Sequence, residues 1–141
     1  MKTNRKDSEL ENSGPPPAGD PLVVSEGSGR TAVALELSLQ GDDYLLQVTG
    51  GRAHVGAVAV AFPGGTELMT VPGHREGPLA VECAAAVAAA SGRTCAVVAG
   101  IHQDDATSGE IIAIVDNVRR GLEAVILRAF PTATEPGENH E

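Results

Sequence analysis

The sequence predicts one α/β domain, α+β-like in layout: a mostly antiparallel five-stranded sheet with one parallel β-α-β crossover and two helices packed on it. Three observations predict this fold. Residues 31–71 repeat apolar and turn-forming positions at the spacing of strands, and helical spacing begins at Gly77. A short apolar run lies between the two helical stretches, so one strand must be reached through a helix. A length of 141 residues suits one such domain.

An antiparallel hairpin opens the predicted sheet. Residues 31–39 alternate between apolar and polar side chains, as expected of a strand with one buried face. Four aliphatic residues share that face: Val33, Leu35, Leu37 and Leu39. The segment 40–43, Gln-Gly-Asp-Asp, has the composition of a turn. Residues 44–48 are therefore expected to return as the second strand.

A second hairpin is expected after the glycines at 50 and 51. Residues 54–62 are apolar on both faces, which is typical of a central strand that is covered on both sides. A Pro-Gly-Gly turn at 63–65 precedes the fourth strand, residues 67–71. Because the connection is short, these two strands should be antiparallel neighbours.

The first predicted helix follows the fourth strand. Pro78 suits the first turn of a helix, and alanines fill most of 79–90 without a breaker. Ser91-Gly92 is a typical helix end. Residues 94–99 are then expected to form a buried fifth strand, parallel to the fourth.

The second predicted helix is long for so small a domain. Thr107 and Glu110 match a capping box at its start, and Pro131 ends it after about Ala129. Five apolar residues form a stripe at helical spacing: Ile111, Val115, Val118, Leu122 and Val125. The length of the helix also suggests an oligomer interface, so we expect a homo-oligomer.

The predicted domain covers 30–129. Residues 1–29 are rich in Pro, Gly, Ser and charges, so we expect a disordered N-terminal extension, in which only 22–24 form a short apolar run. Residues 130–141 are expected to form a disordered acidic tail.

Composition excludes several classes of function. The net charge is −9, and the stretch 31–130 has eleven acidic residues against six arginines, so a nucleic-acid-binding or membrane-surface role is not expected. Cys83 and Cys95 fall within predicted core elements, as in proteins of reducing compartments. The chain shows neither a signal peptide nor a membrane span, so we expect a cytoplasmic protein.

Three histidines are predicted at one edge of the sheet. His54 opens the third strand, His74 follows the fourth and His102 follows the fifth. The end of one strand lies beside the start of its antiparallel neighbour, and parallel strands end at the same edge. That edge is where open α/β sheets bind ligands.

Three imidazoles can hold a divalent transition metal whose identity the spacing does not define. Asp104, Asp105 and Glu76 could complete the coordination or orient the rings. The alternative is that the histidines are ordinary polar residues at strand ends, because their spacing matches no compact metal motif.

The same edge also suits a phosphate group. Gly73 and Gly100 permit close approach of a ligand to the backbone, and the helix that begins at Gly77-Pro78 presents free N–H groups. Arg75 lies just before that helix. Each feature alone has a simpler structural explanation, since glycines end strands and most arginines are solvated.

Three segments together resemble a known family. They are residues 54–59, His-Val-Gly-Ala-Val-Ala; residues 71–75, Val-Pro-Gly-His-Arg; and residues 99–104, Ala-Gly-Ile-His-Gln-Asp. The chain resembles the prenylated-flavin chaperone-like family, typified by a small accessory component of gallate decarboxylase, over about residues 30–128. That family is similar in fold to proteasome-assembly chaperones.

The resemblance implies an accessory protein that binds prenylated FMN and delivers or matures it for a UbiD-type decarboxylase. It implies cofactor binding at positions that match the family motifs: Gly73, His74, Arg75, Gly100, His102 and Asp104. A metal at His54, His74 and His102 is compatible with this interpretation. Such a protein is an accessory subunit rather than an enzyme, with cofactor maturation as the one catalytic activity left open.

Two other classes of function stay open. The first is a protein-interaction module of the assembly-chaperone kind, without a small-molecule site. The second is a small metal-dependent enzyme, for which Glu76 or Asp104 would be the available general base. The client decarboxylase and any redox chemistry are not defined by the sequence.

Overall fold

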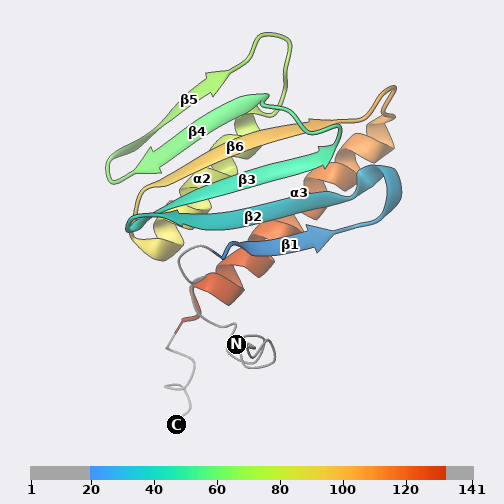
Figure 1. Cartoon of the computed structure of the whole chain (residues 1–141). Coiled ribbons are helices and arrows are strands. Elements are labelled where there is room, and N and C mark those ends of the chain that lie inside the picture. The colour runs from blue at the N-terminus through green and yellow to red at the C-terminus, as the bar shows by residue number, and fades with distance from the viewer. Residues whose placement is uncertain (1–19, 133–141) are drawn as a thin grey trace.

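The computed structural model describes residues 20–132 of the chain. The predicted extension and tail therefore lie, for residues 1–19 and 133–141, outside the described residues. The described part is a six-stranded sheet in the order β1-β2-β3-β6-β4-β5, with two helices (Figure 1). In chain order the elements are β1 (Leu22–Glu26), the 3-10 turn η1 (Gly29–Thr31), β2 (Val33–Gln40), β3 (Asp43–Gly51), β4 (Ala57–Phe62), β5 (Gly65–Thr70), α2 (Gly77–Ser91), β6 (Cys95–His102) and α3 (Ser108–Ala129).

The mixed α/β class and the two helices are confirmed, but the sheet has six strands rather than five. The additional strand, β1, lies at the edge of the sheet and pairs antiparallel with β2. Only Val24 of this strand is buried, opposite Leu35. A five-residue edge strand with one buried side chain has too little periodicity to separate it from the polar segment before it.

The predicted crossover exists, but its two strands are not neighbours. Residues 65–70 and 95–102 run in the same direction because both are antiparallel to β4, which lies between them. The parallel pairing is between β3 and β6, from Tyr44 opposite Cys95 to Gly51 opposite His102. Strand β6 therefore joins the two hairpins into one sheet.

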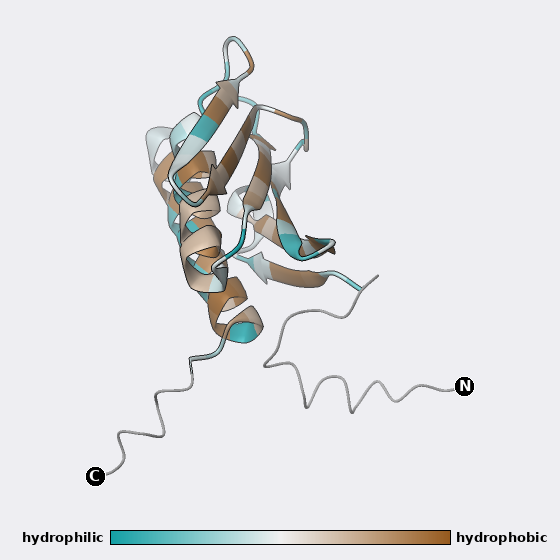
Figure 2. Cartoon of the chain, turned by 90° about the vertical axis from the view of Figure 1, so that its left-hand side faces the viewer, coloured by the Kyte–Doolittle hydropathy of each residue, from teal (hydrophilic) through white to brown (hydrophobic). Residues whose placement is uncertain are grey.

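Both helices cover the same face of the sheet (Figures 1 and 2). Helix α2 packs on β4, β5 and β6, and α3 packs on β1 and β2. The largest buried aliphatic side chains come from both layers: Leu35, Leu37, Leu46, Val48, Val87, Val97, Val118 and Val125. Each fully buried Leu or Val contributes about 2 kcal/mol of transfer free energy.

The other face of the sheet has no covering layer among the described residues. The sequence predicts that strand β4 is covered on both sides, whereas the single chain covers one. Ala57, Ala59 and Ala61 face the helices and are buried. The alternate residues Val58 and Val60 lie on the open face and are partly exposed.

Helix α3 begins as predicted. Glu110 N–H donates to Thr107 Oγ1 over 3.0 Å, and Thr107 N–H donates to Glu110 Oε1 over 3.0 Å. The predicted apolar stripe is only partly core. Val118, Leu122 and Val125 are buried, whereas Ile111 is 46% exposed and Ile114 is buried near it instead. No helix within residues 20–132 is long and apolar enough to cross a membrane.

Candidate functional site

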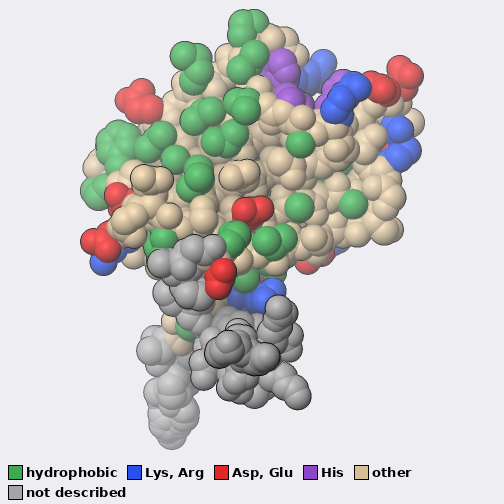
Figure 3. Space-filling model, viewed as in Figure 1, with side chains coloured by type: hydrophobic (Ala, Val, Ile, Leu, Met, Phe, Trp, Pro, Cys, Tyr) green, Lys and Arg blue, Asp and Glu red, His purple; other side chains and the backbone are tan. Residues whose placement is uncertain are grey.

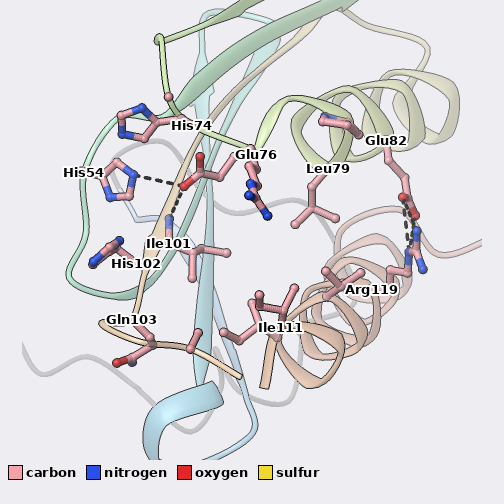
Figure 4. A pocket seen from close by; sticks show the side chains of 16 residues that line it. His54, His74, Glu76, Leu79, Glu82, Ile101, His102, Gln103, Ile111 and Arg119 are labelled. Atoms are coloured by element: carbon pink, nitrogen blue, oxygen red, sulfur yellow. Dashed lines mark hydrogen bonds and ion pairs between the residues drawn. The ribbon is translucent and has the colours of Figure 1, made fainter. Parts of the chain in front are cut away.

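The three predicted histidines lie together at the end of the sheet where β3 and β6 finish (Figure 4). The ring centroids of His54 and His74 are 4.9 Å apart, and those of His54 and His102 are 6.3 Å apart. His102 is the last residue of β6, and His74 lies in the β5–α2 connection. The prediction that His54 opens a strand is wrong, because His54 lies in the loop that precedes β4.

The loop that carries His54 packs tightly on the end of β6. Gly56 N–H donates to Ala99 O over 2.8 Å, which closes the loop onto the strand. A side chain at Gly100 would overlap the backbone carbonyl of His54, so only glycine lets the two backbones approach. Gly100 therefore serves the site by positioning His54, and it does not line the cavity described below.

Glu76 ties three segments together behind the histidines. Its Oε2 accepts a hydrogen bond from Ile101 N–H at 3.0 Å and lies 3.1 Å from His54 Nε2. A side chain at Gly56 would overlap the same carboxylate. Glu76 Oε1 is buried and has no hydrogen-bond partner among the described residues. Glu76 thus fixes the positions of His54 and β6, and it keeps a polar oxygen available inside the site.

The contacts of His54 fix the orientation of its ring. Nδ1 lies 3.1 Å from the carbonyl oxygen of Arg52, which can only accept, so Nδ1 carries a hydrogen. Nε2 is buried without a hydrogen bond among the described residues, and it lies 3.1 Å from Glu76 Oε2.

His74 and His102 are oriented differently. His74 Nδ1 lies 3.2 Å from Val71 O and 3.1 Å from Pro72 O, so it carries the hydrogen and Nε2 keeps a free lone pair. His102 Nε2 lies 2.9 Å from Asp104 Oδ1. His74 is therefore the imidazole with an uncommitted nitrogen.

Asp104 lies beside the site rather than in its wall. Its Oδ1 is 2.9 Å from His102 Nε2 and 3.0 Å from an Arg52 guanidinium nitrogen. The hydrogen bond from His102, followed by the charge of Arg52, lowers the pKa of Asp104 below its ordinary value. The family resemblance implies that Asp104 contacts the cofactor, but the structure places it where it orients His102 and Arg52.

A cavity of about 520 Å³ extends from the histidines toward the space between α2 and α3. Its wall includes the predicted residues Gly73, His74, Arg75 and His102, together with His54. Its other lining residues are Glu76, Pro78, Leu79, Glu82, Ile101, Gln103, Ala106, Ile111, Ile114, Val115 and Arg119. One end of the cavity is thus rich in imidazoles, and the other is formed by aliphatic side chains of the two helices.

Sequence reasoning missed the helix-borne half of this wall. Ile111 and Val115 are expected in the core stripe of α3, and their incomplete burial arises because they face the cavity. Leu79 and Arg119 have no sequence signal at all, since residues on two different helices become neighbours only when the helices pack. Their participation could not be found from local spacing.

Two arginines of the wall differ in their interactions. Arg119 forms a paired contact with Glu82, with Nε 3.0 Å from Oε2 and a terminal nitrogen 3.0 Å from Oε1. This hydrogen bonding raises the pKa of Arg119 above its ordinary value. Arg75 makes no hydrogen bond or ion pair with any other residue in 20–132. Arg75 is therefore the cation of the cavity that is available to an anionic ligand.

The two helix starts also differ. Helix α2 begins at Gly77 with Pro78 next, and no side chain caps it. Pro78 has no N–H group, and Ala80 N–H donates to Glu76 O. The N–H groups of Gly77 and Leu79 therefore stay available beside the cavity. At α3, by contrast, the capping box of Thr107 and Glu110 already uses the Glu110 N–H group. The α2 start is thus the better candidate for an anion.

Within residues 20–132, no cluster of three or more His, Cys, Asp or Glu residues has the geometry to hold a metal ion. The reason is visible in the hydrogen bonds: Nε2 of His54 lies against Glu76, and Nε2 of His102 lies against Asp104. A metal at the three histidines would require both imidazoles to leave these carboxylates.

The cysteines are not candidates for a nucleophile. Cys83 and Cys95 are both buried and free. Burial raises the pKa of each thiol to about 12, so neither forms the reactive thiolate at neutral pH. Their role is packing in the core.

A sheet with helices on one face is also found in a solved structure. This chain is similar to a chain in the crystal structure of a chaperone complex for assembly of the yeast 20S proteasome, with a TM-score of 0.52 and 11% sequence identity over 76% of this chain and 97% of that chain. At this identity the likeness shows the fold alone.

Comparison at the sequence level gives the family. No curated protein matches this chain. The profile of the prenylated flavin chaperone LpdD-like domain matches residues 27–129, which include the three histidines, Glu76 and Arg75. The chain therefore belongs to the prenylated flavin chaperone LpdD-like family, and this confirms the resemblance that the histidine-bearing segments carry.

Proposed function

We propose that this chain binds prenylated FMN in the cavity beside the histidines and delivers or matures it for a UbiD-type decarboxylase. The observation that carries the proposal is the cavity itself: in a member of a prenylated-flavin chaperone family, it joins an imidazole-rich end to an aliphatic wall and an unpaired arginine.

The size and lining of the cavity support a ligand of this kind. A volume of about 520 Å³ falls within the usual range of small-molecule sites, which is about 300–1,000 Å³. None of the lining residues is Phe, Tyr or Trp. The ring system would therefore lie against Leu79, Ile101 and Ile111, where flat apolar contact is available without aromatic stacking.

The charge of the ligand suits one end of this wall. The stretch 31–130 has a net charge of −5, so an anionic ligand needs a local cation. Arg75 is unpaired among the described residues and lies just before the start of α2, whose free N–H groups favour negative charge. We assign the phosphate to Arg75 and the start of α2.

The imidazoles would hold and orient the ring system. His74 Nε2 is free to accept a hydrogen bond, and His54 Nε2 and Glu76 Oε1 are buried polar atoms without a hydrogen bond among the described residues, so a ligand could use them. The modified flavin supplies the decarboxylation chemistry once it is in the client enzyme. The residues of this chain therefore need only bind the cofactor, orient it and shield it from water.

Metal binding is a variant of the same proposal. A divalent transition metal at His54, His74 and His102 would bridge the imidazoles to the ligand after His54 and His102 leave Glu76 and Asp104. Metal analysis of the purified protein, with a His74→Ala/His102→Ala double mutant as the control, tests whether the histidines bind a metal. Equal metal content in the two proteins would eliminate metal binding at the histidines.

A second candidate function is a protein-interaction module without a small-molecule site. The observation that favours it is the apolar open face of the sheet, on which another protein could dock (Figure 3). The histidine end favours the first candidate, because imidazoles with fixed orientations and a buried unpaired carboxylate oxygen have no role in a docking face.

Transfer of the cofactor tests the proposed function. An apo UbiD-type decarboxylase is incubated with prenylated FMN, either free or preloaded on this chain, and its activity is followed over time. We expect faster or more complete activation from the preloaded chain, and a smaller gain from a preloaded His74→Ala variant. Equal activation by free and preloaded cofactor would contradict delivery.

A further inference from the structure

The face of the sheet opposite the helices is apolar across the neighbouring strands β6 and β4. Inward and outward residues alternate along each strand, so the neighbours of the buried Ala59 and Val97 project from the open face. We call these side chains the open-face patch: Leu45, Val58, Val60, Phe62, Met69, Ala96 and Val98. Strand register makes the patch continuous, because Val58 lies opposite both Val98 and Met69.

The patch lacks the polar residues expected of a solvated face. Figure 3, which views this face, shows hydrophobic side chains gathered over the β4, β5 and β6 region with few charges among them. The charged strand residues that project from the face are acidic, Glu36, Asp43 and Glu67, and they lie around the patch. No Lys or Arg of a described strand lies on it.

The sequences of the neighbouring strands β4 and β6 show the same mismatch. Strand β4 reads Ala-Val-Ala-Val-Ala-Phe and most of β6 reads Cys-Ala-Val-Val-Ala-Gly, so neither alternates with polar residues. Strands with this pattern are normally buried on both faces. In this chain, the helices supply one cover and no described residue supplies the other.

The rest of the chain has little apolar surface with which to cover the patch. Residues 1–19 contain two large aliphatic side chains, those of Met1 and Leu10, and residues 133–141 contain none. These residues offer too few apolar side chains to cover the patch, which favours a cover from another molecule. A second copy of this chain offers a patch of the same size and apolarity.

The open face is large enough for a stable dimer. Six strands about 4.8 Å apart and about six residues long give a whole face of roughly 24 by 20 Å, of which the open-face patch occupies part of β3, β6, β4 and β5. Polar residues around the patch, such as Gln47 and Thr49, would contribute the rest of the contact, which with protruding side chains comes near the typical scale of about 800 Å² per partner. A two-fold contact uses the same patch on both copies.

We propose that two copies of this chain pack open face against open face, with Val58 and Val98 at the centre of the interface and the helices outside. The acidic residues around the patch stay at the solvated rim. The cavity lies on the helix side of the sheet, so the dimer leaves both cavities open. This inference does not depend on what the cavity binds.

The test is the mass of the full-length chain in solution, measured by light scattering and sedimentation at micromolar concentration. We expect twice the chain mass of 14.3 kDa. Val98→Glu places a carboxylate in the apolar centre of the interface and should weaken association by about 100-fold or more. The matched control is Leu127→Glu, at a 63% exposed position of α3 on the opposite layer, which should remain a dimer.

A second measurement covers the case in which Val98→Glu fails to fold. Val58→Cys introduces a small thiol on the open face, against a background of two buried cysteines. Its maleimide labelling should slow as protein concentration rises, because association buries it. A monomeric wild-type chain, a Val98→Glu protein that remains a dimer, or labelling of Val58→Cys independent of concentration would each overturn the proposal.

Discussion

The two ends of the cavity differ in how many of their polar groups already have partners. At the helix end, Arg119 and Glu82 satisfy each other through paired contacts of 3.0 Å. At the histidine end, Arg75 has no partner among the described residues, His74 Nε2 is free, and Glu76 Oε1 is buried without a hydrogen bond. Arg75 is exposed and solvated, whereas Glu76 Oε1 is buried, and a buried polar oxygen without a partner is costly unless a ligand uses it. The comparison indicates that the histidine end is the binding end and that the helix end mainly supplies shape.

The largest expected effect tests whether the histidine end depends on close backbone packing. Gly100→Ala adds a methyl group that overlaps the His54 carbonyl. We expect a loss of about 2–3 kcal/mol in the free energy of unfolding, as for other overpacking changes, together with displacement of His54. Urea denaturation measures the stability. Gly109→Ala, whose added methyl group would meet only Thr107 Oγ1 at an ordinary contact distance of 3.9 Å, is the control and should be neutral or stabilising. Equal stability of Gly100→Ala and wild type would show that the loop is free to move.

The second prediction compares the two arginines of the cavity. Arg75→Ala should weaken binding of prenylated FMN by about 1.5–3 kcal/mol, the range for a hydrogen bond to a charged group, without unfolding the protein. Arg119→Ala should have a smaller effect, because that side chain is already paired with Glu82. Fluorescence titration measures both, with Arg93→Ala, remote from the cavity, as a matched control. If Arg119→Ala weakened binding more than Arg75→Ala, the phosphate would be assigned to the helix end of the cavity instead.

The third prediction concerns the free imidazole. His74→Ala removes one neutral hydrogen-bonding nitrogen, so binding should weaken by about 1 kcal/mol, close to the usual value of such a bond. His140→Ala, whose histidine lies outside the described residues, is the control in the same titration. A loss above about 3 kcal/mol would indicate that His74 is a metal ligand rather than a hydrogen-bond partner.

The smallest expected effect is a pH dependence at the rim of the site. His102 and Arg52 lower the pKa of Asp104, so the ionised carboxylate favours the folded state. This contribution is fully present above the ordinary carboxyl pKa of 3.8 and is lost as pH falls through the lower folded value. Asp104→Asn should therefore be slightly less stable than wild type at neutral pH, with the difference shrinking below pH 3.8. Denaturation curves at several pH values, with Asp105→Asn as the control, measure it, and a difference that grows toward acid pH would contradict this assignment.

The sequence predicted the histidine end better than the helix end, for a physical reason. Strand ends and glycines are local features, and strand direction alone brings His54, His74 and His102 to one edge. One detail of strand order was wrong, because β4 separates β5 from β6, and cofactor binding by Asp104, which lies outside the cavity wall, stays a prediction. The strand order depends on which strands pair, and strand pairing is non-local.

The helix end could not be predicted because it exists only after packing. The apolar stripe of α3 indicated a buried face but did not distinguish residues that contact the sheet, such as Val118, from residues that face the cavity, such as Ile111. The edge strand β1 was missed for a related reason, since one buried residue, Val24, gives no period. The sequence of β4 predicts that both faces of the strand are buried, but the described residues bury only one face. The proposed dimer would bury the other.

The most direct test of the central claim is titration of the purified full-length chain with prenylated FMN in its oxidised and reduced forms, each with and without added divalent metal. The proposed site predicts saturable binding of at least one form, at one cofactor per chain, that is weakened by Arg75→Ala and much less by Arg93→Ala. Absence of binding of either form under all four conditions would contradict the account and leave the protein-interaction module as the function of this chain.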